Sequence, residues 1–261
     1  MIDYIYDGTF EGFLTCVHHH YYNEKAAGIY PADQYQTSLL KPYLSVETDE
    51  EKAAVVYAAM ESKISEQALE RIYRVFLSDL PGKDNIALDY LRLGFKIGGR
   101  IFGLHSHPVV FAAERIARKV GYEAHRLTGL LRFSVLARED EEGRRQEILF
   151  AKIKPDHDIL ELLAHHFTDR FKEEAFIIYD ERRKRALFAF GKKWYIGGLD
   201  PSVLPEADAD ERAYRKLWKT YFDGIAIKER INPRCQKNFM PVRYWDNLTE
   251  FHCEAGGNRV E

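Results

Sequence analysis

The hydrophobic pattern of this chain changes its period once, near residue 128, and this change limits the folds that the chain can adopt. From about residue 50 to residue 125, apolar residues recur at steps of three and four, which predicts four short helices that form one layer. After residue 128, apolar residues alternate or run over strand lengths between charged or glycine-containing turns, which predicts antiparallel hairpins. Helices and strands that do not alternate regularly are typical of α+β proteins.

Three further elements complete the predicted fold. A strand is expected over Ile2 to Tyr6, followed by a turn at Asp7-Gly8 and a helix that begins near Thr9. Another helix is expected over residues 155–174, between the second and third predicted strands of the hairpin region. The last helix, over residues 210–227, carries apolar and aromatic side chains on one face: Tyr214, Leu217, Trp218, Tyr221, Phe222 and Ile225.

We therefore predict a single α+β unit over residues 1–261. It has an antiparallel sheet of hairpins, a helical layer, and a C-terminal helix followed by an irregular basic tail. The change of pattern also marks a sub-division into a mainly helical part, residues 1–128, and a part with the hairpins, a helix and the basic tail, residues 129–261.

The composition excludes several classes of protein. A hydrophobic content of 46% is that of a soluble globular protein, and a net charge of −3 argues against a protein that coats nucleic acid indiscriminately. The sequence has neither a long apolar run nor a secretory signal, so we expect a cytoplasmic protein without membrane contact. Cys16, Cys235 and Cys253 form no close pair, and no cofactor motif is recognised, so we expect no metal and no cofactor.

The strongest local signal is a stretch of cations, amides and aromatic rings near the C-terminus, residues 225–245. Lys and Arg neutralise phosphates and aromatic rings stack on exposed bases, so their interleaving suits single-stranded or flipped-out nucleic acid. The alternative is a segment clamped over the core by its aromatic residues, with its charges in water or paired to carboxylates. The candidate contacts are Lys228, Arg230, Arg234, Lys237 and Arg243 to phosphate, Tyr244 and Trp245 to a base, and Asn232, Gln236 and Asn238 to base edges or backbone.

Two smaller groups of residues are candidates for chemistry. Arg170 projects close to the middle of an apolar helical stripe, one turn after His166, and an arginine directed at a core needs an anion as its partner. That anion is either a carboxylate of the protein or a phosphate of a ligand. Asp7 and Glu11 suit an acid/base or magnesium pair, or the capping of the first helix, which we favour.

Four segments carry a more specific pattern: "YDGTFEGFL" at residues 6–14, "GLLRF" at 129–133, "PDHDILELLAHHFTDRF" at 155–171, and "WKTYFDGIAIKERINPRCQKNFMPVRYWDNLTEF" at 218–251. In these segments the chain resembles a bacterial family of DNA-metabolism or DNA-repair proteins. Members of that family accompany a radical S-adenosylmethionine protein, and a similar domain occurs fused to uracil-DNA-glycosylase-like domains. The resemblance implies DNA and a radical S-adenosylmethionine protein as partners.

The resemblance also changes which residues are favoured as candidates for binding. A radical S-adenosylmethionine enzyme holds its iron–sulfur cluster with closely spaced cysteines, which this chain lacks, so radical chemistry would belong to the partner. In a DNA-related setting, the phosphate and stacking roles of residues 228–245 become the favoured interpretation. Arg132, His166 and Arg170 follow as motif residues whose charge lies beside apolar neighbours.

The favoured function is a DNA-binding accessory or damage-recognition protein in a repair or metabolism pathway, acting beside a radical S-adenosylmethionine protein. One alternative is a DNA-processing hydrolase or glycosylase that uses Asp7, Glu11 or His166 as acid or base, close to Arg170. The other is a protein-interaction scaffold without nucleic-acid contact, whose tail docks the partner. A steep salt dependence of binding favours phosphate contacts over a hydrophobic protein interface.

Overall fold

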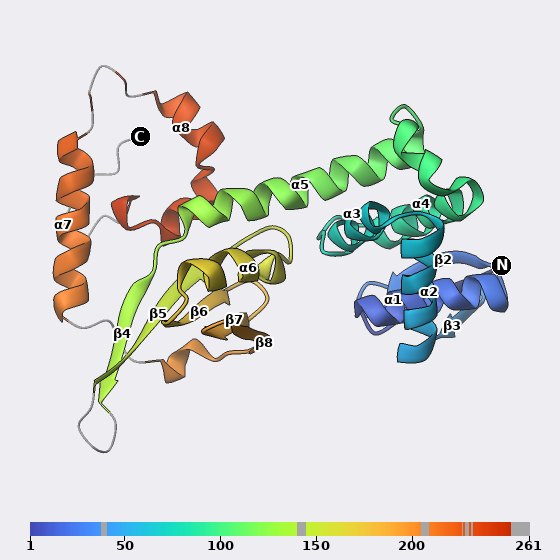
Figure 1. Cartoon of the computed structure of the whole chain (residues 1–261), viewed down its shortest axis with the longest axis horizontal. Helices are drawn as coiled ribbons and strands as arrows, with labels where there is room; N and C mark the ends of the chain where they lie inside the picture. The colour runs from blue at the N-terminus through green and yellow to red at the C-terminus, as the bar shows by residue number, and fades with distance from the viewer. Residues whose placement is uncertain are drawn as a thin grey trace. The chain divides into compact units, whose positions relative to one another are not determined.

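The computed structural model describes residues 1–37, 41–139, 145–204, 209–225, 227, 230 and 232–251. The chain forms two compact units, Met1–Gly121 and Tyr122–Glu261 (Figure 1), and each unit is described by itself. The expectation of one α+β unit over the whole chain stays a prediction. Both units mix helices with strands, as the pattern of the sequence predicts.

The first unit begins with a three-stranded parallel sheet in the order β2-β1-β3. The strand expected at the N-terminus is β1 (Ile2–Tyr6), and α1 (Phe10–Tyr22) follows it after a cap in which the Thr9 hydroxyl accepts a hydrogen bond from the Gly12 N–H. The two outer strands, β2 (Ala26–Pro31) and β3 (Tyr43–Ser45), were not predicted.

Four α-helices and one 3-10 helix follow the sheet of the first unit, and the four predicted helices are confirmed. They are α2 (Glu50–Lys63), α3 (Glu66–Phe76), α4 (Lys83–Ile97), the 3-10 helix Gly98–Gly103 and α5 (Pro108–Leu130). Asp49 and Ser65 cap α2 and α3 through their side chains, as expected for short polar residues at helix starts. The apolar faces of these helices bury a core that includes Phe13, Met60, Ile72, Leu88 and Ile101.

The second unit contains a five-stranded sheet in the order β4-β5-β6-β7-β8 (Figure 1). Its strands are β4 (Ser134–Glu139), β5 (Arg145–Ile153), β6 (Ala175–Asp180), β7 (Arg185–Phe190) and β8 (Lys193–Gly198). Three of the four pairings are antiparallel hairpins, as predicted, but β5 and β6 pair in parallel. The prediction of a purely antiparallel sheet is therefore wrong at this pair, because α6 (Leu160–Arg170) returns the chain to the end from which β5 started.

Helix α6 covers the sheet of the second unit with the apolar stripe expected from its sequence. Leu160, Leu163 and Phe167 are buried, and the helix packs against β7 and β8. At its C-terminal end, the ring of Phe133 contacts those of Phe167 and Phe171 at centroid distances of 5.3 and 4.9 Å. Edge-to-face rings at such distances stabilise a core beyond the area that they bury.

The C-terminal region contains more helix than predicted. The expected helix is α7 (Ala209–Ile225), but the segment after it is not irregular, because it forms α8 (Pro233–Phe239) and 3-10 helices at Val242–Asn247 and Thr249–Phe251. Helix α8 begins where the sequence provides an Asn cap at 232 and a proline in the first turn, which together favour a helix start. Within the part of the chain that the structure describes, neither these helices nor the others have the length and apolar content to cross a membrane.

Candidate functional site

An open pocket of about 850 Å³ lies in the second unit. It is formed by the C-terminal end of α5 and the segment that leads into β4, by the C-terminal end of α6, and by α7. Six aromatic residues contribute to its wall: Phe133, Phe167, Phe171, Tyr214, Trp218 and Tyr221. Pockets of this size and apolar character bind small ligands or parts of larger ones.

The rings of the pocket fall into two groups with different exposure. Phe133 and Phe167 belong to the ring cluster at the edge of the core, so they form a rigid floor. Tyr214, Trp218 and Tyr221 lie on α7 with 69, 41 and 55% of their surface exposed. Exposed rings of this size on one helix face make this surface a candidate for binding.

Two arginines of the pocket are paired with carboxylates of the protein. Arg132 donates two hydrogen bonds to Glu250, at 2.7 and 3.2 Å, and Glu250 is almost fully buried. Burial alone raises the pKa of Glu250, but the hydrogen bonds and charge of Arg132, together with a backbone hydrogen bond and that of Trp218, lower the pKa overall. Arg215 donates to Glu211 at 2.8 Å and to the hydroxyl of Ser134.

Arg170 differs from these two arginines. Its side chain is exposed and lines the pocket, with its guanidinium carbon 5.6 Å from the centre of the Phe171 ring. Among the residues that the structure describes, no carboxylate lies within ion-pair distance of it. The expected burial of Arg170 in the apolar stripe is wrong, because the stripe ends one turn earlier at Phe167 and Thr168. Its positive charge therefore stays available to an anion in the pocket.

The pocket brings together three of the four segments on which the family resemblance depends. Residues 129–133 contribute Arg132 and Phe133, residues 155–171 contribute Arg170 and Phe171, and residues 218–251 contribute Trp218. Arg132 and Arg170 were candidates from the sequence, whereas the aromatic residues of α7 were expected only as an apolar helix face. Their exposure depends on tertiary packing, which no local pattern reveals.

The first half of the basic tail is exposed. Arg230, Arg234, Lys237 and Asn238 face solvent, and their side chains have no hydrogen-bond or ion-pair partner among the described residues. Asn232 caps α8 by accepting the Cys235 N–H, and Gln236 is half-exposed on the same helix. Lys228 lies outside the described residues. The exposed cations remain candidates for phosphate contacts, whereas the Asn232 amide has a structural task.

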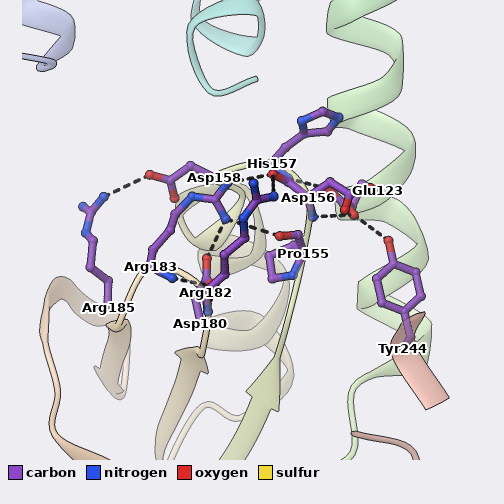
Figure 2. Close-up of polar contacts among 10 residues, drawn as sticks. All are labelled: Glu123, Pro155, Asp156, His157, Asp158, Asp180, Arg182, Arg183, Arg185 and Tyr244. Atoms are coloured by element: carbon purple, nitrogen blue, oxygen red, sulfur yellow. Dashed lines mark hydrogen bonds and ion pairs between the residues drawn. The ribbon is translucent and has the colours of Figure 1, made fainter. Parts of the chain in front are cut away.

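The second half of the tail is anchored to the body of the second unit. Figure 2 shows the Tyr244 hydroxyl directed at Glu123 of α5, to which it donates at 2.6 Å. Arg243 pairs with Glu123 and Asp156 at 3.1 and 3.2 Å. The assignment of Tyr244 to base stacking is wrong, because its surface is only 2% exposed, and the phosphate role of Arg243 competes with two carboxylates.

Trp245 also has partners within the protein. Its ring stacks on Phe251 with centroids 4.4 Å apart, and its indole N–H donates to the carbonyl of Met240. One face of the ring is therefore covered by Phe251. The alternative for the tail is that its aromatic residues clamp it over the core. This alternative describes Tyr244 and Trp245 better than stacking on a base does.

The "PDHD" turn between β5 and α6 is held by a polar network (Figure 2). Arg182 and Arg183, in the turn between β6 and β7, donate to the carbonyl of Asp156, and Arg183 also binds the fully buried carboxylate of Asp180. Arg185 pairs with Asp158 at 2.9 Å. This network fixes the start of the crossover between the two parallel strands, so the specificity of the motif has a structural explanation here.

The candidates for acid/base chemistry lie outside the pocket. Asp7 accepts hydrogen bonds from the N–H and hydroxyl of Thr9 and from the hydroxyl of Thr48, in the loop that caps α1. Burial alone raises the pKa of Asp7, but these hydrogen bonds lower it overall. Glu11 is exposed in the first turn of α1, and His166 is exposed on α6. The expected capping of α1 is made by Thr9, and the Asp7 carboxylate is engaged in holding Thr9 and Thr48, which counts against the enzyme alternative.

The fold and the pocket together define a mixed α/β protein with an arginine-containing aromatic pocket. A family model described as a domain of unknown function (DUF4130) matches residues 81–250, and the chain belongs to this family. All residues that line the pocket fall within the matched region, whereas Asp7 and Glu11 precede it. No curated protein and no solved structure matches the chain.

Proposed function

We propose that the protein is a nucleic-acid-binding accessory or damage-recognition protein, and that its pocket holds an unstacked base next to a phosphate. The observation that carries this proposal is the arrangement of Arg170, which has no described carboxylate partner, beside the exposed rings of Trp218 and Tyr221. An exposed ring contributes roughly 1–3 kcal/mol per stacked base, and an arginine binds a phosphate through two parallel hydrogen bonds. A nucleotide with an unpaired base offers both partners at once.

The chemistry of the pocket favours single-stranded or flipped-out nucleic acid over intact duplex. In a duplex the faces of the bases are stacked on each other, so the rings of α7 would have no surface to contact. The exposed cations Arg230, Arg234 and Lys237 belong to the same unit as the pocket and suit contacts to further phosphates. These contacts position the strand without selecting its sequence.

DNA as the substrate, and a radical S-adenosylmethionine protein as the partner, are part of this proposal through the family resemblance. The cysteines support a division of labour between the two proteins. Cys16 is buried in the first unit and Cys235 is exposed in the second, and Cys253 lies outside the described residues. A radical S-adenosylmethionine cluster needs three cysteines close in sequence, so the cluster would be held by the partner.

A second candidate function is a docking surface for a partner protein. Helix α7 exposes Tyr214, Leu217, Trp218, Tyr221 and Ile225, which are the kinds of residue found at the centres of protein interfaces. A protein ligand would use the same rings but would have little need for Arg170. The two candidates therefore differ in the effect of removing that arginine.

The test measures the fluorescence anisotropy of labelled single-stranded and duplex DNA with the full chain, over a series of salt concentrations. We expect tighter binding to single strands, and about tenfold weaker single-strand binding by Arg170→Ala, since a charge-assisted contact contributes about 1.5 kcal/mol or more. The matched control is Arg126→Ala, because Arg126 is exposed on α5 but does not line the pocket.

The double variant Arg234→Ala/Lys237→Ala examines the exposed cations separately. Losing two phosphate contacts should reduce the slope of log K against log salt by about 1.4 on a single strand. Binding that is unchanged by Arg170→Ala, or weakened equally by the Arg126 control, would contradict the pocket as the site. No binding by the chain alone, together with salt-insensitive binding of the partner that depends on Trp218, would favour the docking function.

A further inference from the structure

The first unit contains a second arginine-rich hollow, which is separate from the pocket described above. It has a volume of about 380 Å³ and lies between α3, the 3-10 helix Gly98–Gly103 and α5. Three arginines and two glutamates line it, namely Arg71, Arg74, Arg118, Glu70 and Glu114. This number of charged groups in one small hollow raises the question of which of them are already paired.

Both glutamates are bound by arginines. Glu114 pairs with Arg71 at 3.0 Å, and both side chains are only 18% exposed. Arg71 is also fixed from its other side, since it donates to the Tyr90 hydroxyl and lies over the Phe102 ring. Glu70 pairs with Arg74 one turn along α3. The acids therefore orient two arginines and leave the third without compensation.

The arginine without compensation is Arg118. Its side chain is exposed, and no carboxylate lies within ion-pair distance of it in the described part of the chain. Arg118 also lines an adjoining hollow of about 700 Å³, whose other residues include His105, Ser106 and Phe111. Arg118 thus lines both hollows.

Arg74 also lines the smaller hollow, and one of its nitrogen atoms has no partner. Its Nε atom is buried without a hydrogen-bond partner. Its guanidinium group lies against Gly121 of α5, where an added Cβ would be only 3.2 Å from Nη1. A glycine inside a helix costs about 1 kcal/mol relative to alanine, and here it leaves the space that Arg74 occupies. The chain thus brings Arg74 close to α5, the helix that also carries Arg118.

We propose that this hollow is a phosphate-binding site, in which Arg118 and Arg74 bind the phosphate oxygens and Gln67 supplies an amide donor at its edge. Guanidinium groups match the geometry of phosphate oxygens, and the paired glutamates hold the arginines in place without repelling the ligand strongly. The inference goes beyond the proposed function, because it concerns the other unit and needs no base. The phosphate belongs either to a small molecule or to the backbone of a nucleic acid.

The test is isothermal titration calorimetry of the full chain with inorganic pyrophosphate. All titrations use an Arg170→Ala background, so that the pocket of the second unit contributes less and contributes equally to every variant. We expect measurable binding that Arg118→Gln weakens at least tenfold, whereas Arg115→Gln leaves it unchanged. Arg115 is the matched control because it is exposed on α5 and lines neither hollow. A second variant, Gly121→Ala, keeps every charge but moves the end of the Arg74 side chain by a few tenths of an ångström, and it should weaken binding less than Arg118→Gln does.

Two outcomes would overturn the proposal: no heat of binding up to millimolar pyrophosphate, or equal affinity in Arg118→Gln and Arg115→Gln. Circular dichroism of each variant establishes that it is folded. A single-stranded oligonucleotide identifies the source of the phosphate. Loss of both ligands in Arg118→Gln indicates a nucleic-acid backbone, and loss of pyrophosphate alone indicates a small phosphorylated molecule. These outcomes are independent of the pocket in the second unit, so they do not depend on the proposed function.

Discussion

Glu123 shows how one buried carboxylate joins segments of the second unit that are far apart in sequence. It lies on α5 with almost no exposure and accepts hydrogen bonds from Tyr244, from Arg243 and from the backbone N–H groups of Asp156 and His157. Burial alone raises the pKa of Glu123, but the hydrogen bond from Tyr244 and those from the backbone lower it overall. The carboxylate thus stays charged and holds the C-terminal segment and the crossover turn on the same helix.

Replacing this carboxylate should destabilise the second unit. In Glu123→Gln the amide N–H₂ faces donors instead of accepting from them, so we expect a loss of about 3 kcal/mol in the free energy of unfolding. Unfolding in urea followed by tryptophan fluorescence measures this unit alone, because Trp194, Trp218 and Trp245 all lie in it. Asp156→Asn is the control, since Asp156 is half-exposed. A similar small effect of both variants would contradict the role of Glu123.

A buried histidine should make the first unit sensitive to acid. His20 is 7% exposed, and its Nδ1 atom accepts the Ala26 N–H at 2.9 Å, so Nδ1 carries no proton and the ring is neutral. Burial, followed by the charges of Arg92 and Lys25, lowers the pKa of His20. A histidine with a lowered pKa in the folded state binds a proton more readily when unfolded. Its contribution to stability is therefore complete above about pH 6.5 and is lost as the pH falls below that value.

The matched variant is His20→Asn, whose side-chain oxygen can accept the same N–H but does not titrate. Thermal unfolding followed by far-ultraviolet circular dichroism between pH 8 and pH 5 compares the two chains. We expect the wild type to lose more stability than the variant over this range, with the difference developing below about pH 6.5. Parallel pH profiles for the two proteins would show that His20 does not cause the effect.

The sequence predicts the place of some site residues and not of others, for a physical reason. Arg132 and Arg170 could be selected from the sequence because a charge among apolar neighbours needs a partner, and both line the pocket. Tyr244 could not be assigned, because its partner Glu123 is distant in the chain and no local pattern connects them. An aromatic residue among cations has the same sequence context whether it contacts a base or a buried carboxylate.

At the scale of elements, the sequence does not indicate that β5 and β6 pair in parallel through a crossover that contains α6. Each strand alternates or runs apolar as a hairpin strand does, so their relative direction depends on the connection and not on the strand itself. The helix over residues 155–174 was predicted, and α6 (Leu160–Arg170) forms within this range. Its return of the chain to the starting end of β5 was not predicted. Likewise β3 has only three residues, too few for a periodic signal.

The turn before α6 fixes this crossover, and its stability should depend on Asp180. Its buried carboxylate accepts the N–H of Arg182 and the N–H and guanidinium group of Arg183, which in turn hold the turn before α6. We expect Asp180→Ala to lower the free energy of unfolding of the second unit by about 2 kcal/mol, because it leaves partly buried donors without their acceptor. Urea unfolding followed by tryptophan fluorescence measures the loss.

The control for this prediction is Asp158→Ala, because the pair of Asp158 with Arg185 is partly exposed and contributes about 1 kcal/mol at most. Hydrogen exchange of residues 155–160 adds a local measure, and it should rise in Asp180→Ala more than in Asp158→Ala. Equal stability and equal exchange in the two variants would mean that the network does not fix the crossover.

At the scale of the whole molecule, the net charge of −3 does not determine the charge at any one site. The exposed side chains of Arg170, Arg230, Arg234 and Lys237 all belong to the second unit, which also contains the aromatic pocket. Under the proposed function, nucleic acid would bind at this surface although the overall charge of the chain is slightly negative. The proposed function therefore depends on the aromatic pocket and not on the charge of the protein as a whole.

The central claim is that the rings of α7 contact an unstacked base, and photo-crosslinking tests it most directly. A single-stranded oligonucleotide with one 5-iodouracil is irradiated with the full chain, and mass spectrometry locates the adduct. The account predicts adducts at Tyr214, Trp218 or Tyr221, which disappear when Arg170 is replaced by alanine and persist in Arg126→Ala. Adducts confined to the basic segment at residues 230–239, or their absence from α7 under conditions where the strand is bound, would contradict it.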